Sequence, residues 1–262
     1  MNPINKPTAM SLLCEATPVV ILAGGKGTRL LPYTAALPKP LMPVGEYPIL
    51  EILLRQLASQ GFRNVTLAVG HLAGLIQAYF KDGKEWGVEI TYAQETTPLG
   101  TAGPIARLPK TERSMLVLNG DLLTTMDFGR IVRFHYEKGA TATIGTTRRK
   151  ETVQFGVIET EQNGKILQYR EKPSLDYLVS MGIYVFAPLV REYIPRAKKF
   201  DFPELVQRLI SADKAVLGYE SDAYWMDIGR PDDYEKANRE FPDMENIFFK
   251  TNVESAAVGT RI

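Results

Sequence analysis

Short apolar runs alternate with helical repeats along the first half of the chain. The apolar runs predict buried strands at residues 19–23, 65–70 and 115–118, and the alternating residues 88–93 predict a further strand. Between the first two runs, residues 48–60 repeat apolar positions every three or four residues, with Pro48 at the start and Gly61 just past the end, which predicts a helix. Strands that alternate with helices at this spacing form right-handed βαβ units. The pattern therefore predicts an α/β fold on a mainly parallel sheet flanked by helices.

The pattern changes from Ala140 onward. Alternating apolar and polar residues predict strands at 140–147, 155–160, 165–169 and 179–186. Asn163-Gly164, between the second and third of these, is a strong hairpin signal. Further elements are expected as a helix at 202–212, a strand at 215–220 and a helix from Pro231 to Phe241. This half should add a smaller antiparallel extension over one side of a cleft.

The two ends of the chain are patterned more weakly than its middle. Residues 1–17 have little periodicity, and their apolar stretch is shorter than the core of a secretion signal, so we interpret them as a flexible leader. Residues 18–242 are interpreted as a single domain with halves at 18–139 and 140–242, and residues 243–262 as a C-terminal tail.

Composition narrows the class of protein. The 262 residues carry a net charge of +1, which gives no reason to expect nucleic acid as a partner. A single cysteine excludes an internal disulfide and fits a reducing, cytoplasmic compartment, and two histidines make a His/Cys zinc site improbable. No apolar run approaches the ~20 residues of a membrane span, so no membrane partner is expected.

The first apolar run ends in a glycine-rich loop, Gly24-Gly25-Lys26-Gly27-Thr28-Arg29. Its glycines allow backbone N–H groups to approach a ligand closely, and Lys26, Arg29 and the later Lys39 add positive charge, as a triphosphate requires. A Walker A loop is excluded because no Gly-Lys pair is followed by Ser or Thr, and a dinucleotide fingerprint because Leu30 stands where its third glycine is needed. The alternative is a plain glycine turn with nearby surface lysines.

Three further segments contain polar residues suited to a nucleotide or its metal ion. Asp121 and Asp227 follow apolar residues and adjoin glycines, where a carboxylate can hold Mg²⁺ or simply form a turn or cap. The segment 94–103 is glycine-rich, which suggests a close backbone approach to a flat ligand, with Gln94 or Glu95 hydrogen-bonding a base edge. Its alternative is a loop before a helix that begins near Thr101, which is compatible with the first reading.

The strings AGGKGTRL (23–30) and LPKPLMPVG (37–45) resemble the signature of the sugar-1-phosphate nucleotidyltransferases, also called nucleotide-sugar pyrophosphorylases. The resemblance extends from about Val19 to Phe241. It implies a Rossmann-like fold of the nucleotide-diphospho-sugar transferase type, with residues 18–139 binding mainly nucleotide and 140–242 mainly sugar. The implied reaction is Mg²⁺-dependent transfer of a nucleotidyl group from an NTP to a sugar 1-phosphate, with release of pyrophosphate.

The resemblance also implies roles for individual residues. Arg29, Lys39 and Lys172 would be catalytic, and Asp121 and Asp227 would hold Mg²⁺. The residues implied in nucleotide binding are Ala23, Gly24, Gly25, Gly27, Thr28, Arg29, Gln94, Glu95, Gly100 and Thr101. The residues implied in sugar binding are Gly156, Glu171, Lys172 and Ser180, of which Ser180 stands where the family usually has Asn.

Substrate choice is less specified. The form E-x-x-PLGTAG, from Glu95 to Gly103, resembles the guanylyltransferases acting on mannose 1-phosphate or manno-heptose 1-phosphate, which implies GTP. Alternatives are a thymidylyl- or uridylyltransferase acting on a glucose 1-phosphate-like sugar, and a catalytically silent regulatory subunit of such an enzyme. The family further implies a homo-oligomer.

Overall fold

The computed structural model describes residues 8–196 and 198–249 and is built on one large sheet. Its strands are β1 Val19–Ala23, β4 Asn64–Val69, β5 Glu89–Gln94, β6 Met115–Asn119, β8 Ala142–Thr152, β11 Ser174–Phe186 and β12 Val216–Glu220. They lie in the order β12-β8-β11-β6-β1-β4-β5. β1 is parallel to β4 and β6, β4 to β5 and β12 to β8, whereas β11 is antiparallel to both β6 and β8. The mainly parallel sheet is therefore confirmed.

Smaller elements surround this sheet. Three two-stranded pairs consist of β2 Pro43–Val44 with β3 Tyr47–Pro48, β7 Leu122–Thr124 with β13 Trp225–Asp227, and β9 Val157–Thr160 with β10 Ile166–Arg170. The α-helices are α1 Ala9–Ala16, α2 Ile49–Ser59, α3 Ala73–Phe80, α4 Gly103–Arg107, α5 Phe128–Glu137, α6 Phe202–Ser211 and α7 Pro231–Phe248. The short 3-10 helices are η1 Thr28–Leu30, η2 Lys39–Leu41, η3 Lys84–Trp86 and η4 Pro188–Tyr193.

Both faces of the sheet are buried, which explains why its central strands are continuously apolar. In β1, Val19 and Ile21 face a core that also contains side chains of α1, α2, α3 and α5. Val20, between them, faces a second core formed with α4, η4 and α6. A third apolar cluster lies under α7 and holds Leu30 and Ile228, which adjoin the glycine loop and Asp227. The helices thus fix both faces of the sheet and the loops at its edge.

The structure corrects the interpretation of the two chain ends. Residues 9–16 are not a flexible leader: they form α1, where the Thr8 side chain accepts a hydrogen bond from the Ser11 N–H at 3.1 Å and Cys14 is buried. The helix at Pro231 does not end at Phe241 but runs to Phe248, because both phenylalanines are buried and stack on each other. The start of the expected tail is therefore helical. Residues 1–7 and 250–262 lie outside the described part.

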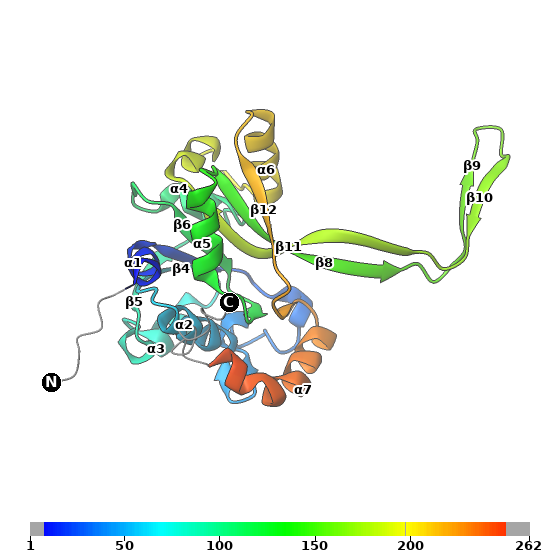
Figure 1. Ribbon diagram of the computed structural model, residues 1–262. Coiled ribbons are helices and arrows are strands. Elements are labelled where there is room, and N and C mark those ends of the chain that lie inside the picture. Colours follow the sequence, from blue (N-terminus) through cyan, green and yellow to red (C-terminus); the bar gives the residue numbers. More distant parts are fainter. Residues whose placement is uncertain (1–7, 197, 250–262) are drawn as a thin grey trace, which may run out of the picture.

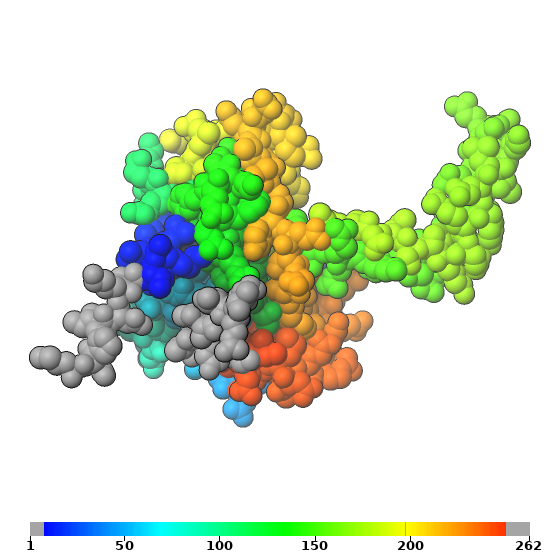
Figure 2. Space-filling model, in the orientation of Figure 1, coloured from blue at the N-terminus to red at the C-terminus, as the bar shows by residue number. Residues whose placement is uncertain are grey.

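The antiparallel extension is present but does not cover the cleft of its own chain. Beyond the sheet, β8 and β11 continue as a two-stranded ribbon that ends in the β9–β10 hairpin (Figure 1). We call residues 147–179 the arm; it projects from the body of the molecule (Figure 2). At its base, three residues of β11 oppose one of β8, and Gly182 takes a φ of 71° with its Cα facing the Asn119 side chain. This bulge fixes where the ribbon leaves the sheet.

Candidate active site

The site lies where parallel strands β1 and β6 end side by side, with Leu22 paired to Asn119. The glycine loop follows β1 and Asp121 follows β6, so both emerge at the same sheet edge, as expected for ligand sites in such sheets. One cavity of about 210 Å³ is lined by Leu22, Ala23, Gly25, Gly27, Thr28, Arg29, Leu30, Lys39, Pro40, Gly120, Asp121 and Gly229. An adjoining cavity of about 370 Å³ shares Leu22, Gly25, Arg29 and Asp121 with it and adds Gly24, Ala68, Glu95, Pro98, Gly100, Thr101, Pro104, Asn119 and Asp227. Because they share these residues, the two form one cleft.

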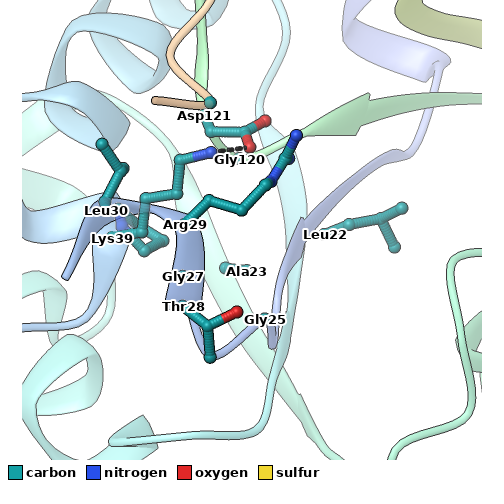
Figure 3. Close-up of a pocket in the computed structure, with 12 residues that line it drawn as sticks. Leu22, Ala23, Gly25, Gly27, Thr28, Arg29, Leu30, Lys39, Gly120 and Asp121 are labelled. Atoms are coloured by element: carbon teal, nitrogen blue, oxygen red, sulfur yellow. Dashed lines mark hydrogen bonds and ion pairs between the residues drawn. The ribbon is translucent and has the colours of Figure 1, made fainter. Parts of the chain in front are cut away.

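The glycine loop is held in place at its end. Gly27 has a φ of 63°, and a Cβ there would lie 3.0 Å from the Thr34 methyl group, so a side chain would be both strained and crowded. The Thr34 hydroxyl donates to the Gly27 carbonyl at 2.8 Å, and Leu30 is fully buried in the third apolar cluster. These contacts leave the Gly25 backbone and the Arg29 side chain facing the cavity (Figure 3).

Lys39 projects into the same cavity and pairs with Asp121 (Figure 3). The lysine begins η2 between two prolines, and its side chain is only 11% exposed, against 23% for Asp121. The pair uses Oδ2 of the aspartate, whereas Oδ1 is buried and has no hydrogen-bond partner among the described residues. A buried carboxylate oxygen without a partner is costly unless a ligand satisfies it.

Asp227 is brought next to Asp121 by pairing between β13 and β7. Asp227 stands opposite Leu122, and the Ile228 N–H donates to the Asp121 carbonyl at 3.2 Å. Burial raises the pKa of the Asp227 carboxyl, and the negative charge of Asp121 raises it further, while Lys39 and Arg29 act in the opposite direction. The described residues hold no group of three or more His, Cys, Asp or Glu suited to a metal. Two neighbouring carboxylates nevertheless fit a cation such as Mg²⁺, which takes its other ligands from phosphate and water.

The adjoining cavity is shaped by the loop after β5. Glu95 accepts a hydrogen bond from the Leu99 N–H at 3.1 Å, and burial raises the pKa of its carboxyl. Asp201 accepts from the Thr101 N–H at 2.8 Å, and the Thr101 hydroxyl in turn accepts from the Phe202 N–H at 2.8 Å. The loop is thereby tied to the start of α6. Asp201 positions a wall of the cleft, a role that local sequence patterns did not reveal.

The expected site residues divide into two groups. The cleft is lined by Ala23, Gly24, Gly25, Gly27, Thr28, Arg29, Lys39, both aspartates, Glu95, Gly100 and Thr101. Lys26 of the glycine loop and Gln94, which ends β5, line neither cavity. Gly156 lies between β8 and β9, Glu171 and Lys172 lie between β10 and β11, and none of the three lines the cleft of its own chain. Ser180 lies at the base of the arm, where its hydroxyl donates to the Tyr184 hydroxyl at 3.1 Å.

Asn119 and Gly229 are among the lining residues that were not predicted from the sequence. Asn119 is the last residue of β6, immediately before Gly120-Asp121, so its place at the strand end was a usable signal. Gly229 follows the Asp227 segment, and a Cβ there would lie 3.4 Å from Arg29 Nη1. No local pattern predicts that this glycine faces Arg29, because the contact joins segments that are distant in sequence.

Comparisons with known proteins agree with this geometry. A family model described as "Nucleotidyl transferase" matches residues 18–243. The UTP–glucose-1-phosphate uridylyltransferase of Synechocystis sp. is 38% identical over 240 residues, covering 84% of this chain and 62% of that protein. The mannose-1-phosphate guanylyltransferase catalytic subunit beta of Drosophila melanogaster is 36% identical over 231 residues, covering 84% and 61%. The crystal structure of HddC from Yersinia pseudotuberculosis matches with a TM-score of 0.68 at 25% identity, covering 86% and 99%.

The chain matches only part of the length of these two relatives. The chain spans about 62% of the Synechocystis relative and 61% of the Drosophila relative. Among the helices of residues 8–196 and 198–249, none is long and apolar enough to cross a membrane.

Proposed function

We propose a sugar 1-phosphate nucleotidyl transfer for this chain, which belongs to the nucleotidyl transferase family. The observation that carries the proposal is the meeting of a glycine loop and two cations with a pair of carboxylates at the ends of β1 and β6. The glycine loop and the cations would hold a triphosphate, and the carboxylates would hold a divalent cation that supplies positive charge to it. Both relatives described above bear the names of sugar-1-phosphate nucleotidyltransferases.

In this reaction an oxygen of the sugar phosphate attacks the α-phosphorus of the NTP. The new P–O bond forms as the bond from the α-phosphorus to the β-phosphate oxygen breaks, and pyrophosphate leaves in line. The protein contributes mainly positioning and charge neutralisation. The backbone from Gly25 to Thr28 and the Arg29 guanidinium would hold the β- and γ-phosphates. Lys39 would exchange its contact with Asp121 for oxygens of the α-phosphate and the leaving group.

A divalent cation fits the carboxylate pair. The unpartnered Oδ1 of Asp121 and the raised pKa of Asp227 both indicate negative charge that the surrounding protein does not fully compensate. Asp121 and Asp227 would hold Mg²⁺, which when bound supplies positive charge for the phosphate oxygens. Lys39 and Arg29, which line the same cavity as Asp121, would neutralise the rest of the negative charge.

GTP is the nucleotide we propose. The Glu95 carboxylate lies in the adjoining cavity, and a carboxylate pairs well with the two neighbouring N–H donors on the Watson–Crick edge of guanine. The Drosophila relative is named as a guanylyltransferase on mannose 1-phosphate. The Synechocystis relative is named as a uridylyltransferase on glucose 1-phosphate. UTP with glucose 1-phosphate is therefore the second candidate substrate pair for this chain.

Pyrophosphate release tests the proposal. The protein is incubated with Mg²⁺ and each of GTP, dTTP, UTP, CTP and ATP, crossed with hexose and heptose 1-phosphates. Release with GTP and a manno-configured sugar is the expected result, and release with UTP or dTTP and glucose 1-phosphate would replace the choice of base and sugar. The Asp121→Asn variant provides the background rate. Folded protein that binds nucleotide but releases no pyrophosphate with any pair would favour a regulatory subunit instead. The cytoplasmic location stays a prediction.

A further inference from the structure

The arm is a paired ribbon whose far end lies away from the body (Figure 2). Seven consecutive residue pairs, from Ser180 opposite Thr146 to Ser174 opposite Thr152, form an unbroken antiparallel ladder. Six residue steps at about 3.4 Å each place the far end roughly 20 Å beyond the base. Folding this ribbon back over its own cleft would break the ladder. Residues at its end therefore do not serve the cleft of the same chain in this fold.

The arm exposes more apolar surface than a free hairpin in water would favour. Phe155 is 76% exposed, and Ile166, Leu167, Tyr169 and Leu175 are each more than half exposed. All five residues belong to the arm, which projects from the body of the molecule (Figure 2). A two-stranded ribbon without a covered face is marginal by itself, and apolar clusters of this kind mark interaction surfaces. The arm thus has the character of an element that packs against something.

Between the ribbon and the β9–β10 hairpin lie residues 153–156 and 171–173, which we call the elbow. A hydrogen-bonded pair of polar side chains lies there. The Tyr169 hydroxyl donates to the Glu171 carboxylate at 2.8 Å. A Cβ on Gly156 would lie 2.2 Å from that hydroxyl oxygen, so a larger residue there would force the Tyr169 side chain to shift. Lys172 has a φ of 42°, a strained conformation for a residue with a side chain. Glu171 and Lys172, a carboxylate and a cation adjacent in the chain, thus lie outside both cavities of their own cleft.

The cleft, in turn, is short of positive charge for two phosphate substrates. Among the described residues that line its two cavities, the only cations are Arg29 and Lys39. Lys39 is already paired with Asp121, and a triphosphate would occupy both. A second substrate that brings its own phosphate requires a further cation. The elbow holds such a cation, Lys172, but it does not line the cleft of its own chain.

We propose that two copies of this chain exchange arms, so that each arm packs on the other copy and its elbow closes the other cleft. Lys172 of the partner subunit would neutralise the acceptor phosphate, and Glu171 of the partner subunit would accept hydrogen bonds from sugar hydroxyls. This assignment of the elbow rests on the proposed function. The arm packs on a second copy because the elbow supplies the further cation that this cleft lacks. A two-fold exchange also covers the apolar surface of both arms in one closed dimer.

The particle mass tests the exchange without reference to activity. Sedimentation is measured for the wild type and for a variant in which Asn-Gly replaces residues 148–178, joining the paired Thr147 and Val179 by a two-residue turn. The wild type is expected to be a dimer and the trimmed variant a folded monomer. Phe155→Asp, at a position that is 76% exposed, weakens the dimer without threatening the fold and serves if the trimmed variant does not fold. A monomeric wild type, or a dimer unchanged by both variants, overturns the exchange.

Mixing two inactive variants tests the shared site. Lys172→Ala spoils the arm and leaves the cleft intact, whereas Asp227→Asn spoils the cleft and leaves the arm intact. After joint unfolding and refolding in equal amounts, about half of the dimers are mixed, and each mixed dimer has one complete site, so about a quarter of the wild-type activity should return. The control mixes Lys172→Ala with the double variant Lys172→Ala/Asp227→Asn and should stay inactive.

The two experiments distinguish the failures. An arm-dependent dimer without recovery in the mixture overturns the shared site, because each arm then acts only on its own chain or not at all. A wild type that releases no pyrophosphate with any substrate pair refutes the proposed function, and the sedimentation result then decides the arm exchange alone.

Discussion

Replacing Lys39 with methionine should separate the stability of the site from its activity. Methionine keeps the apolar length of the side chain but removes the charge that faces Asp121. The Asp121 side chain is only 23% exposed, so it would remain largely out of water with neither oxygen paired to a cation. Leaving such a carboxylate without its partner costs about 1–3 kcal/mol of unfolding free energy, below the cost for a fully buried pair. For a chain of this size, that lowers the melting temperature by roughly 2–12 °C.

A double variant tells which effect belongs to which role. Adding Asp121→Asn to Lys39→Met removes the orphaned charge, so most of the lost stability should return. Turnover should stay low in both variants, because the charge at the α-phosphate and leaving group is still missing, a loss of about 10²–10³-fold in kcat. Urea unfolding and pyrophosphate release measure the two quantities.

A lysine in the same loop provides the control. Lys26 is exposed and makes no ion pair among the described residues, so Lys26→Met should change stability by less than about 0.5 kcal/mol. Near-normal turnover of Lys39→Met would refute its role in the reaction. A loss of stability that Asp121→Asn does not reverse would refute the electrostatic reasoning.

Three further predictions concern the fold around the site. Gly182→Ala should cost more unfolding free energy than Gly139→Ala in urea titrations, because both have positive φ but a Cβ at Gly182 meets the Asn119 side chain at 2.6 Å, whereas one at Gly139 meets nothing within 4 Å; equal costs would contradict this. Burial lowers the pKa of His135 to about 4, below the ~6.5 of an unfolded chain, so its contribution to stability is complete above pH 6.5 and is lost as the pH falls toward 4. His135→Gln should therefore flatten the dependence of urea midpoints on pH between 7 and 4, and an unchanged slope would argue against it. Burial raises the pKa of the Cys14 thiol to about 11, so a thiol reagent at pH 8 should label it only as the protein unfolds, and rapid labelling of native protein would contradict the packing of α1.

Much of the fold could be predicted because its signals are local. The run from Val19 to Ala23 is apolar at every position, which is typical of a short strand buried on both faces, and β1 has these bounds. The Asn163-Gly164 turn lies between the strands β9 and β10 as expected. The α1 helix was missed because only Cys14 of its eight residues is fully buried, so its apolar repeat is weak. Its existence depends on packing against α5.

The sequence by itself determined which chemical groups the protein possesses and where they lie relative to strands. A glycine loop after one buried strand and Asp121 after another place phosphate and metal chemistry at one sheet edge, because parallel strands end together. Tertiary structure alone decided that Asp227 adjoins Asp121 through the pairing of β13 with β7, and that Asp201 holds the Thr101 loop. It also decided that Lys172 lies on an arm, because the direction of the β8–β11 ribbon depends on a ladder between distant segments and on the bulge at Gly182. Local patterns specify strands and turns, but not where a ribbon leaves the sheet or which cleft it reaches.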